Sequence, residues 1–170
     1  IDLPGHGERL DRSMHSPEQT LYVVEQAVQE IDAVVRALGD DRFGGAFDAS
    51  RIAIGGMSAG GMAALRRLCA AHPFVCAAVE STAGDFSLMP AYTGRYPQDV
   101  IDRLDPSQHL DTWRPIPLLA LHSEADAWVP VDAIRSFIKT LRERYDAEGA
   151  DPDLAALQTW PSAGAPAEHA

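Results

Sequence analysis

Apolar residues recur at steps of three and four over residues 24–38 of the chain. This spacing, which runs from Val24 to Leu38, places them on one side of a helix. Ser16 and Pro17 precede the pattern and Gly39 follows it. We therefore expect a helix that begins at Pro17, with Ser16 as its cap, and that ends before Gly39.

Short apolar runs alternate with further helical patterns along the rest of the chain. The runs at residues 51–55, 75–80, 117–122 and 154–160 predict strands, and periodic stretches at 59–71 and 131–145 predict helices. Residues 81–114 are irregular, with a short helix expected near 97–104. This alternation predicts an α/β fold with a mostly parallel sheet, helices on both of its faces, and functional residues beyond the carboxyl ends of the strands.

The first predicted strand leads into a Gly-x-Ser-x-Gly motif over residues 56–60, and a predicted helix follows. This order is typical of a nucleophile elbow, a tight turn that exposes Ser58 above the sheet. We expect glycine at positions 56 and 60 because a Cβ atom at either would collide with the neighbouring strand and helix. The spacing excludes a dinucleotide fingerprint and a phosphate-binding P-loop. The remaining alternative is a glycine-rich turn without chemistry.

Two later segments place titratable residues beyond strand ends. The third predicted strand leads into His122, Glu124 and Asp126, and the fourth is followed by a loop that contains His169. Asp126 could simply cap the helix that begins near Pro130. The first three side chains could also be drawn as metal ligands, but no second histidine cluster supports a metal site.

Four segments together resemble the α/β-hydrolase family. In chain order they are Asp2-Leu3-Pro4-Gly5-His6-Gly7, the elbow at Ser58, the segment Leu121-His122-x-x-x-Asp126-x-x-Val129-Pro130, and the late His169. Within this family, the chain resembles esterases related to the prolyl oligopeptidase and dienelactone hydrolase branches. The resemblance implies Ser58 as nucleophile, Asp126 as orienting acid, His169 as general base and the backbone N–H of Ala59 as an oxyanion donor.

This resemblance implies a serine hydrolase that cleaves a small-molecule carboxylic ester through an acyl-enzyme, without metal or organic cofactor. Met57 and Trp128 are expected to bind substrate. Residues 81–114 are expected to form a lid or cap over Ser58, lined by Phe86, Met89, Tyr92, Tyr96 and Trp113. A serine peptidase of the prolyl oligopeptidase type is the first alternative, because it has the same triad. A non-catalytic binding protein with this fold is the second.

The chain is expected to be one α/β-hydrolase domain, residues 1–170, without the first strands and the last helix of the fold. It begins at Ile1 without an initiator methionine and ends abruptly, so we expect a fragment of a longer protein. The loop that normally supplies the second oxyanion donor would then lie before Ile1. One side of the sheet would be an exposed edge.

Composition narrows the classes of partner. The formal net charge is −11, which argues against binding of nucleic acid or anionic membrane surfaces. No apolar run approaches the roughly 20 residues of a membrane span. Cys69 and Cys76 lie in a helical and a strand-like pattern, so both are interpreted as small apolar residues rather than as a disulfide.

Overall fold

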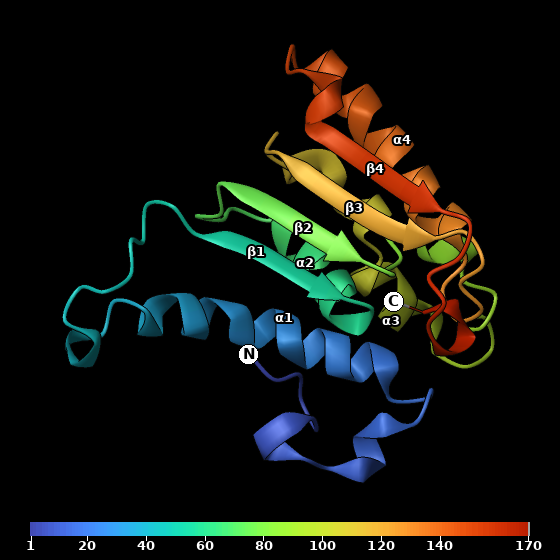
Figure 1. Cartoon of the computed structure of the whole chain (residues 1–170), viewed down its shortest axis with the longest axis horizontal. Coiled ribbons are helices and arrows are strands. Elements are labelled where there is room, and N and C mark those ends of the chain that lie inside the picture. Colours follow the sequence, from blue (N-terminus) through green and yellow to red (C-terminus); the bar gives the residue numbers. More distant parts are fainter. Residues whose placement is uncertain (170) are drawn as a thin grey trace.

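A computed structural model describes residues 1–169 of the chain. Its centre is a four-stranded parallel sheet in the order β1-β2-β3-β4, formed by Ala53–Met57, Cys76–Glu80, Leu118–Ser123 and Ala155–Trp160 (Figure 1). All four predicted strands are confirmed, each shifted by two residues or fewer. The arrowheads point the same way, so the carboxyl ends of the strands meet at one edge of the sheet.

Four α-helices connect and cover the strands. They are α1 (Thr20–Ala37), α2 (Ala59–Leu68), α3 (Gln98–Leu104) and α4 (Val131–Ala147). The predicted start of the first helix is wrong. Residue 16 does not cap α1, which begins four residues later; instead, the Ser16 carbonyl accepts the N–H of Gln19 in the preceding turn (2.9 Å). Short 3-10 turns complete the structure at Gly7–Arg9, Arg12–His15, Asp41–Phe43, Phe86–Leu88, Pro106–Thr112, Pro152–Leu154 and Pro166–Glu168.

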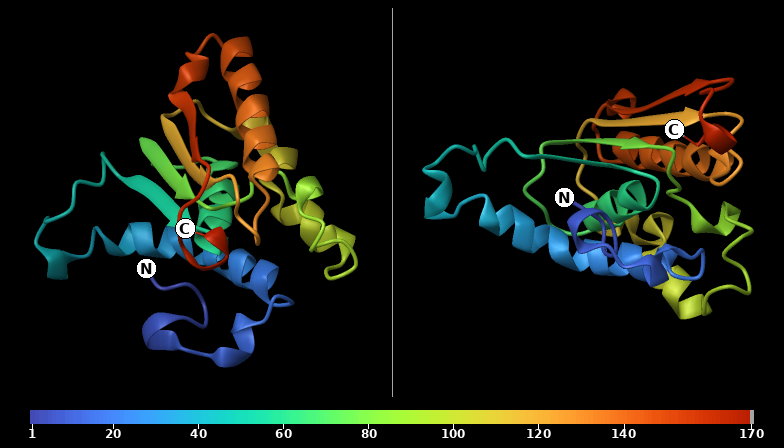
Figure 2. Two further views of the ribbon diagram at one scale, coloured as in Figure 1. Left: turned by 45° about the vertical axis from the view of Figure 1, so that its right-hand side comes forward. Right: turned by 60° about the horizontal axis from the view of Figure 1, so that its bottom comes forward.

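Within residues 1–169 the helices lie on one face of the sheet, not on both as expected (Figure 2). The strands follow one another in chain order, and right-handed crossovers between successive neighbours place every connecting helix on the same side. The core therefore forms between that face and helices α2 and α4, with Val79, Ala120, Leu65 and Phe137 all buried. On the opposite face Ala78 and Leu119 are exposed.

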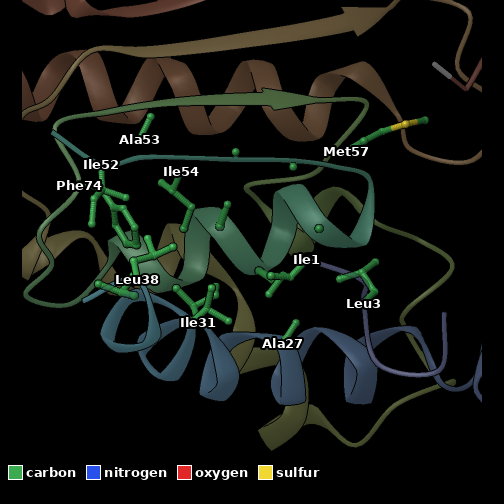
Figure 3. Close-up of a pocket in the computed structure, with 17 residues that line it drawn as sticks. Ile1, Leu3, Ala27, Ile31, Leu38, Ile52, Ala53, Ile54, Met57 and Phe74 are labelled. Carbon is green, nitrogen blue, oxygen red and sulfur yellow. The ribbon is translucent and has the colours of Figure 1, made fainter. Parts of the chain in front are cut away.

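Strand β1 is an edge of the described sheet, and an apolar groove runs beside it (Figure 3). The groove lies between β1 and helices α1 and α2, and Ile1, Leu3, Ala27, Ile31 and Ile54 are among the side chains that line it. None of the described side chains that line it is polar or charged. The cavity beside Ser58 differs because polar and charged side chains contribute to its lining, although Leu3 and Met57 line both.

Candidate active site

Ser58 occupies the tight turn between β1 and α2. Its backbone angles are φ 53° and ψ −122°, in a region that side chains other than glycine rarely adopt. Three hydrogen bonds hold this conformation. The Ser58 N–H donates to the carbonyl of Glu80 (2.9 Å), and the Ser58 carbonyl accepts from the Met62 N–H (3.0 Å) and the Thr82 hydroxyl (2.8 Å). The turn is thus fastened to both neighbours of the serine, strand β2 and helix α2.

The glycines of this turn differ in what they accommodate. A Cβ atom on Gly56 would overlap the backbone of Gly60 and lie 2.8 Å from the amide nitrogen of Gly61. A Cβ atom on Gly61 would lie 2.7 Å from the Thr82 side chain. At Gly60 the nearest atom is the tip of Leu3, 4.0 Å away, so the expected collision at this position is wrong. The close approach of strand and helix needs glycine at positions 56 and 61.

Asp126 and His169 are in direct contact beyond the ends of β3 and β4. The His169 Nδ1–H donates to Asp126 Oδ2 at 2.8 Å, and the two side chains are 6% and 0% exposed. The other carboxylate oxygen, Oδ1, accepts the backbone N–H groups of Trp128 and Val129, each at 2.9 Å. These bonds fix the carboxylate and leave His169 Nε2 as the nitrogen available to accept a proton.

The loop that carries His169 is built around Glu168. The Glu168 carboxylate accepts from the Ser162 hydroxyl and from the amides of Ala163 and Gly164, and these bonds lower its pKa, the Ser162 bond most. A backbone bond from the Ala127 N–H to the Ala167 carbonyl (3.0 Å) ties this loop to the turn after Asp126. The loop that carries the imidazole is therefore held both by its own Glu168 bonds and by its bond to the turn that carries Asp126.

His122 lies beneath the acid turn and is fully buried. Its Nε2–H donates to the Val129 carbonyl (2.9 Å) and lies 3.6 Å from Asp126 Oδ2. Glu124, the rival carboxylate, faces away, toward Arg135 (2.7 Å) and Thr159 (2.9 Å). In residues 1–169 no group of three or more His, Cys, Asp or Glu side chains is arranged to hold a metal ion.

The burial of His122 predicts a pH dependence of stability. Burial lowers the pKa of this imidazole, with the Val129 carbonyl and Asp126 acting in the opposite direction. The unfolded chain therefore binds a proton here at pH values where the folded chain does not. Hence the free energy of unfolding decreases as pH falls from about 6.5 toward the lower folded pKa, by at most about 1.4 kcal/mol per pH unit.

Urea unfolding of wild type and His122→Asn between about pH 8 and about pH 5 measures this effect. The variant should have the shallower dependence on pH. Burial also lowers the pKa of His72, but that residue is present in both proteins and cancels in the comparison. Equal slopes in the two proteins would contradict the assignment.

Ser58 opens into a cavity of about 600 Å³. Ala59, Met57 and Trp128 line it as well. The Trp128 ring lies 4.9 Å from the ring of His169, so this side chain joins the cavity to the acid–histidine pair. Among the described residues no hydrogen bond links Ser58 to His169, whose side-chain hydrogen bond is the one to Asp126.

The segment 81–114 contributes less of the cavity wall than expected. Met89 and Tyr92 line the cavity, whereas Phe86 and Tyr96 are buried in the adjoining core. Trp113 lies elsewhere: it is buried against α4, and its indole N–H donates to the Tyr145 hydroxyl (2.9 Å).

The lining also includes residues that the sequence did not point to, among them Met14, His15 and Arg95. His15 is exposed, and its ring stacks on that of His6 at 4.4 Å. His6 and His15 are nine residues apart in the sequence, and only the folded loop of residues 4–15 brings both of them to the cavity.

Among solved structures, several α/β proteins are similar to this chain. A puromycin-hydrolysing peptidase from Mycobacterium tuberculosis has a TM-score of 0.63 at 24% identity, over 79% of this chain and 21% of its own. An acylaminoacyl peptidase from Pyrococcus horikoshii has 0.60 at 18%, over 92% and 25%. Esterase B from Lactobacillus rhamnosis has 0.52 at 20%, over 78% and 47%. The chain thus spans less than half the length of these structures.

A search of curated proteins gave no match. Within residues 1–169, none of the helices combines the length and the apolar character that crossing a bilayer requires. The model of the family described as "Alpha/beta hydrolase family" matches residues 1–168, which is nearly the whole length of the chain. The chain therefore belongs to the alpha/beta hydrolase family.

Proposed function

We propose that this chain is a serine hydrolase that cleaves carboxylic esters through an acyl-enzyme. The observation that carries the proposal is the buried Asp126–His169 hydrogen bond at the sheet edge where Ser58 stands in a strained turn. A serine hydroxyl becomes a strong nucleophile only when a positioned base takes its proton. A serine in a strained turn and a histidine oriented by a buried carboxylate, both beyond the carboxyl ends of parallel strands, support this chemistry.

The proposed mechanism has two halves. His169 Nε2 takes the hydroxyl proton of Ser58 while Oγ attacks the ester carbonyl, and Asp126 stabilises the imidazolium that forms. The Ala59 N–H donates to the tetrahedral oxyanion. His169 then returns the proton to the departing alkoxide. Water, activated by the same imidazole, cleaves the acyl-serine and restores the hydroxyl.

Labelling with a fluorophosphonate probe, read by intact mass, tests this proposal directly. The phosphonyl group should attach to wild type in a single copy and should not attach to Ser58→Ala. Peptide mapping should place the adduct on Ser58. Absence of labelling of the wild-type chain would overturn the proposal and favour a binding protein of this fold.

Hydrolysis of a peptide or amide bond is a second candidate, because it uses the same three residues. Two of the similar structures are peptidases by name and one is an esterase, and the shared fold does not separate them. A matched pair of substrates with one acyl group, a p-nitrophenyl ester and a p-nitroanilide, distinguishes the two activities. Cleavage of the ester alone supports the esterase. Efficient cleavage of the anilide supports the peptidase.

A further inference from the structure

The charged residues that line the cavity beside Ser58 differ in sign from the excess over the whole chain. The whole chain carries 25 acidic and 14 basic residues, yet no Asp or Glu lines this cavity. Arg95 is the one Lys or Arg side chain in its lining. A guanidinium in a wall whose described residues include no carboxylate favours a ligand with a negative charge, because that charge gains a partner and the apolar parts of the ligand leave water.

Arg95 is available to such a ligand. Its one described ion pair is a long contact, 3.9 Å from Nε to Glu18 Oε1, with the two side chains 33% and 62% exposed. Exposed pairs of this kind contribute little, and a guanidinium has five N–H donors in a fixed fork. The backbone of Arg95 is held by its N–H bond to the Tyr92 carbonyl (3.1 Å). The residue is thus anchored at its main chain, with side-chain donors free to meet a carboxylate.

Most of the other lining side chains are apolar, and His6, His15, Thr20 and Ser58 are the polar ones besides the Tyr92 hydroxyl. The chain has only four methionines, and all four line this cavity: Met14, Met57, Met62 and Met89. Met62 and Met89 are buried, whereas Met57 is exposed, as is Trp128 at 65%. Thioether side chains are flexible and polarizable, so they fit apolar groups of varied shape.

We propose that the substrate is an ester with an apolar body and a carboxylate, and that Arg95 binds this carboxylate while the methionines hold the body. This inference rests on the proposed function and names its substrate class. Arg95 is a specificity-determining residue in this scheme. The ester carbonyl lies at Ser58, and the charged end of the substrate lies at the cavity wall formed by Ala91, Tyr92 and Arg95.

Matched ester pairs test the proposal on either side of the scissile bond. For a charge on the acyl side, the pair is mono-p-nitrophenyl adipate and its methyl ester. For a charge on the alcohol side, the pair is 4-(butanoyloxy)benzoate and its methyl ester. The measured quantity is the ratio of kcat/KM for the anionic ester to that for the neutral one. Arg95→Met removes the charge at similar length, and Arg36→Met is the control, since Arg36 is exposed and lines no described cavity.

We expect at least one of the two pairs to favour the anionic ester in wild type. The ratio for that pair should fall roughly 10-fold in Arg95→Met, mainly through KM, and should not change in Arg36→Met. It should also fall in wild type between about 0.05 M and about 0.5 M salt. Circular dichroism checks that the variants are folded.

Two outcomes would overturn the inference, and they are distinguishable. If the neutral esters are hydrolysed and neither anionic partner is favoured, or if the ratio is equal in Arg95→Met and wild type, the substrate class is wrong and the hydrolase proposal stands. If no ester is hydrolysed and the fluorophosphonate does not attach to Ser58, both proposals are wrong.

Discussion

The rate of ester hydrolysis should fall by roughly 10⁴- to 10⁶-fold in Ser58→Ala, and adding His169→Gln to that variant should lower it little further. The reason is that nucleophile and base act in one step, so removing either one removes the covalent pathway. Binding and oxyanion stabilisation by the remaining groups then set the residual rate. The measurement is kcat for wild type, the two single variants and the double variant, on one p-nitrophenyl ester.

The control for this cycle is His109→Gln. His109 donates from Nε2 to the Asp102 carbonyl (2.8 Å) and does not line the Ser58 cavity, so kcat should stay within a factor of about two. Effects of Ser58→Ala and His169→Gln that multiply in the double variant would mean that the two residues act independently. A loss below about 10-fold in Ser58→Ala would show that another group is the nucleophile.

Much of the fold could be predicted from the sequence because hydrophobic periodicity reports local structure. The four strands are short apolar runs between turns, and α1 and α4 have clear helical spacing, so their existence was predictable. Their boundaries were less so. Pro17 suggested an early start for α1, but residues 16–19 form a turn, and the Gln19 carbonyl accepts the first helical bond, from the Val23 N–H.

The candidate site divides in the same way. The elbow motif and the order of segments placed Ser58, Asp126 and His169 beyond strand ends, and the structure brings the last two into hydrogen-bond contact. Their catalytic roles stay predictions. The cavity wall was not predictable, because Arg95 reaches it from an irregular segment whose path depends on tertiary packing. The single covered face of the sheet was missed for a related reason: strand order, which decides it, is not encoded in local periodicity.

Gly56→Ala should lower the free energy of unfolding by about 3 kcal/mol or more, whereas Gly60→Ala should raise it by roughly 0.5–1 kcal/mol. The new methyl at position 56 would overlap the backbone at the start of α2, which cannot yield as a flexible side chain does. At position 60, inside α2, the methyl meets only the tip of Leu3 at 4.0 Å. There the better helix propensity of alanine prevails.

Urea unfolding followed by circular dichroism measures both changes on a common scale. The pair is internally controlled, because both substitutions are chemically identical and lie two residues on either side of Ser58. Equal destabilisation at the two positions would contradict the described geometry and would restore the symmetrical role that the Gly-x-Ser-x-Gly pattern suggests. Opposite signs would show that the first glycine of the motif allows strand and helix to approach, and that the second is not required by packing within residues 1–169.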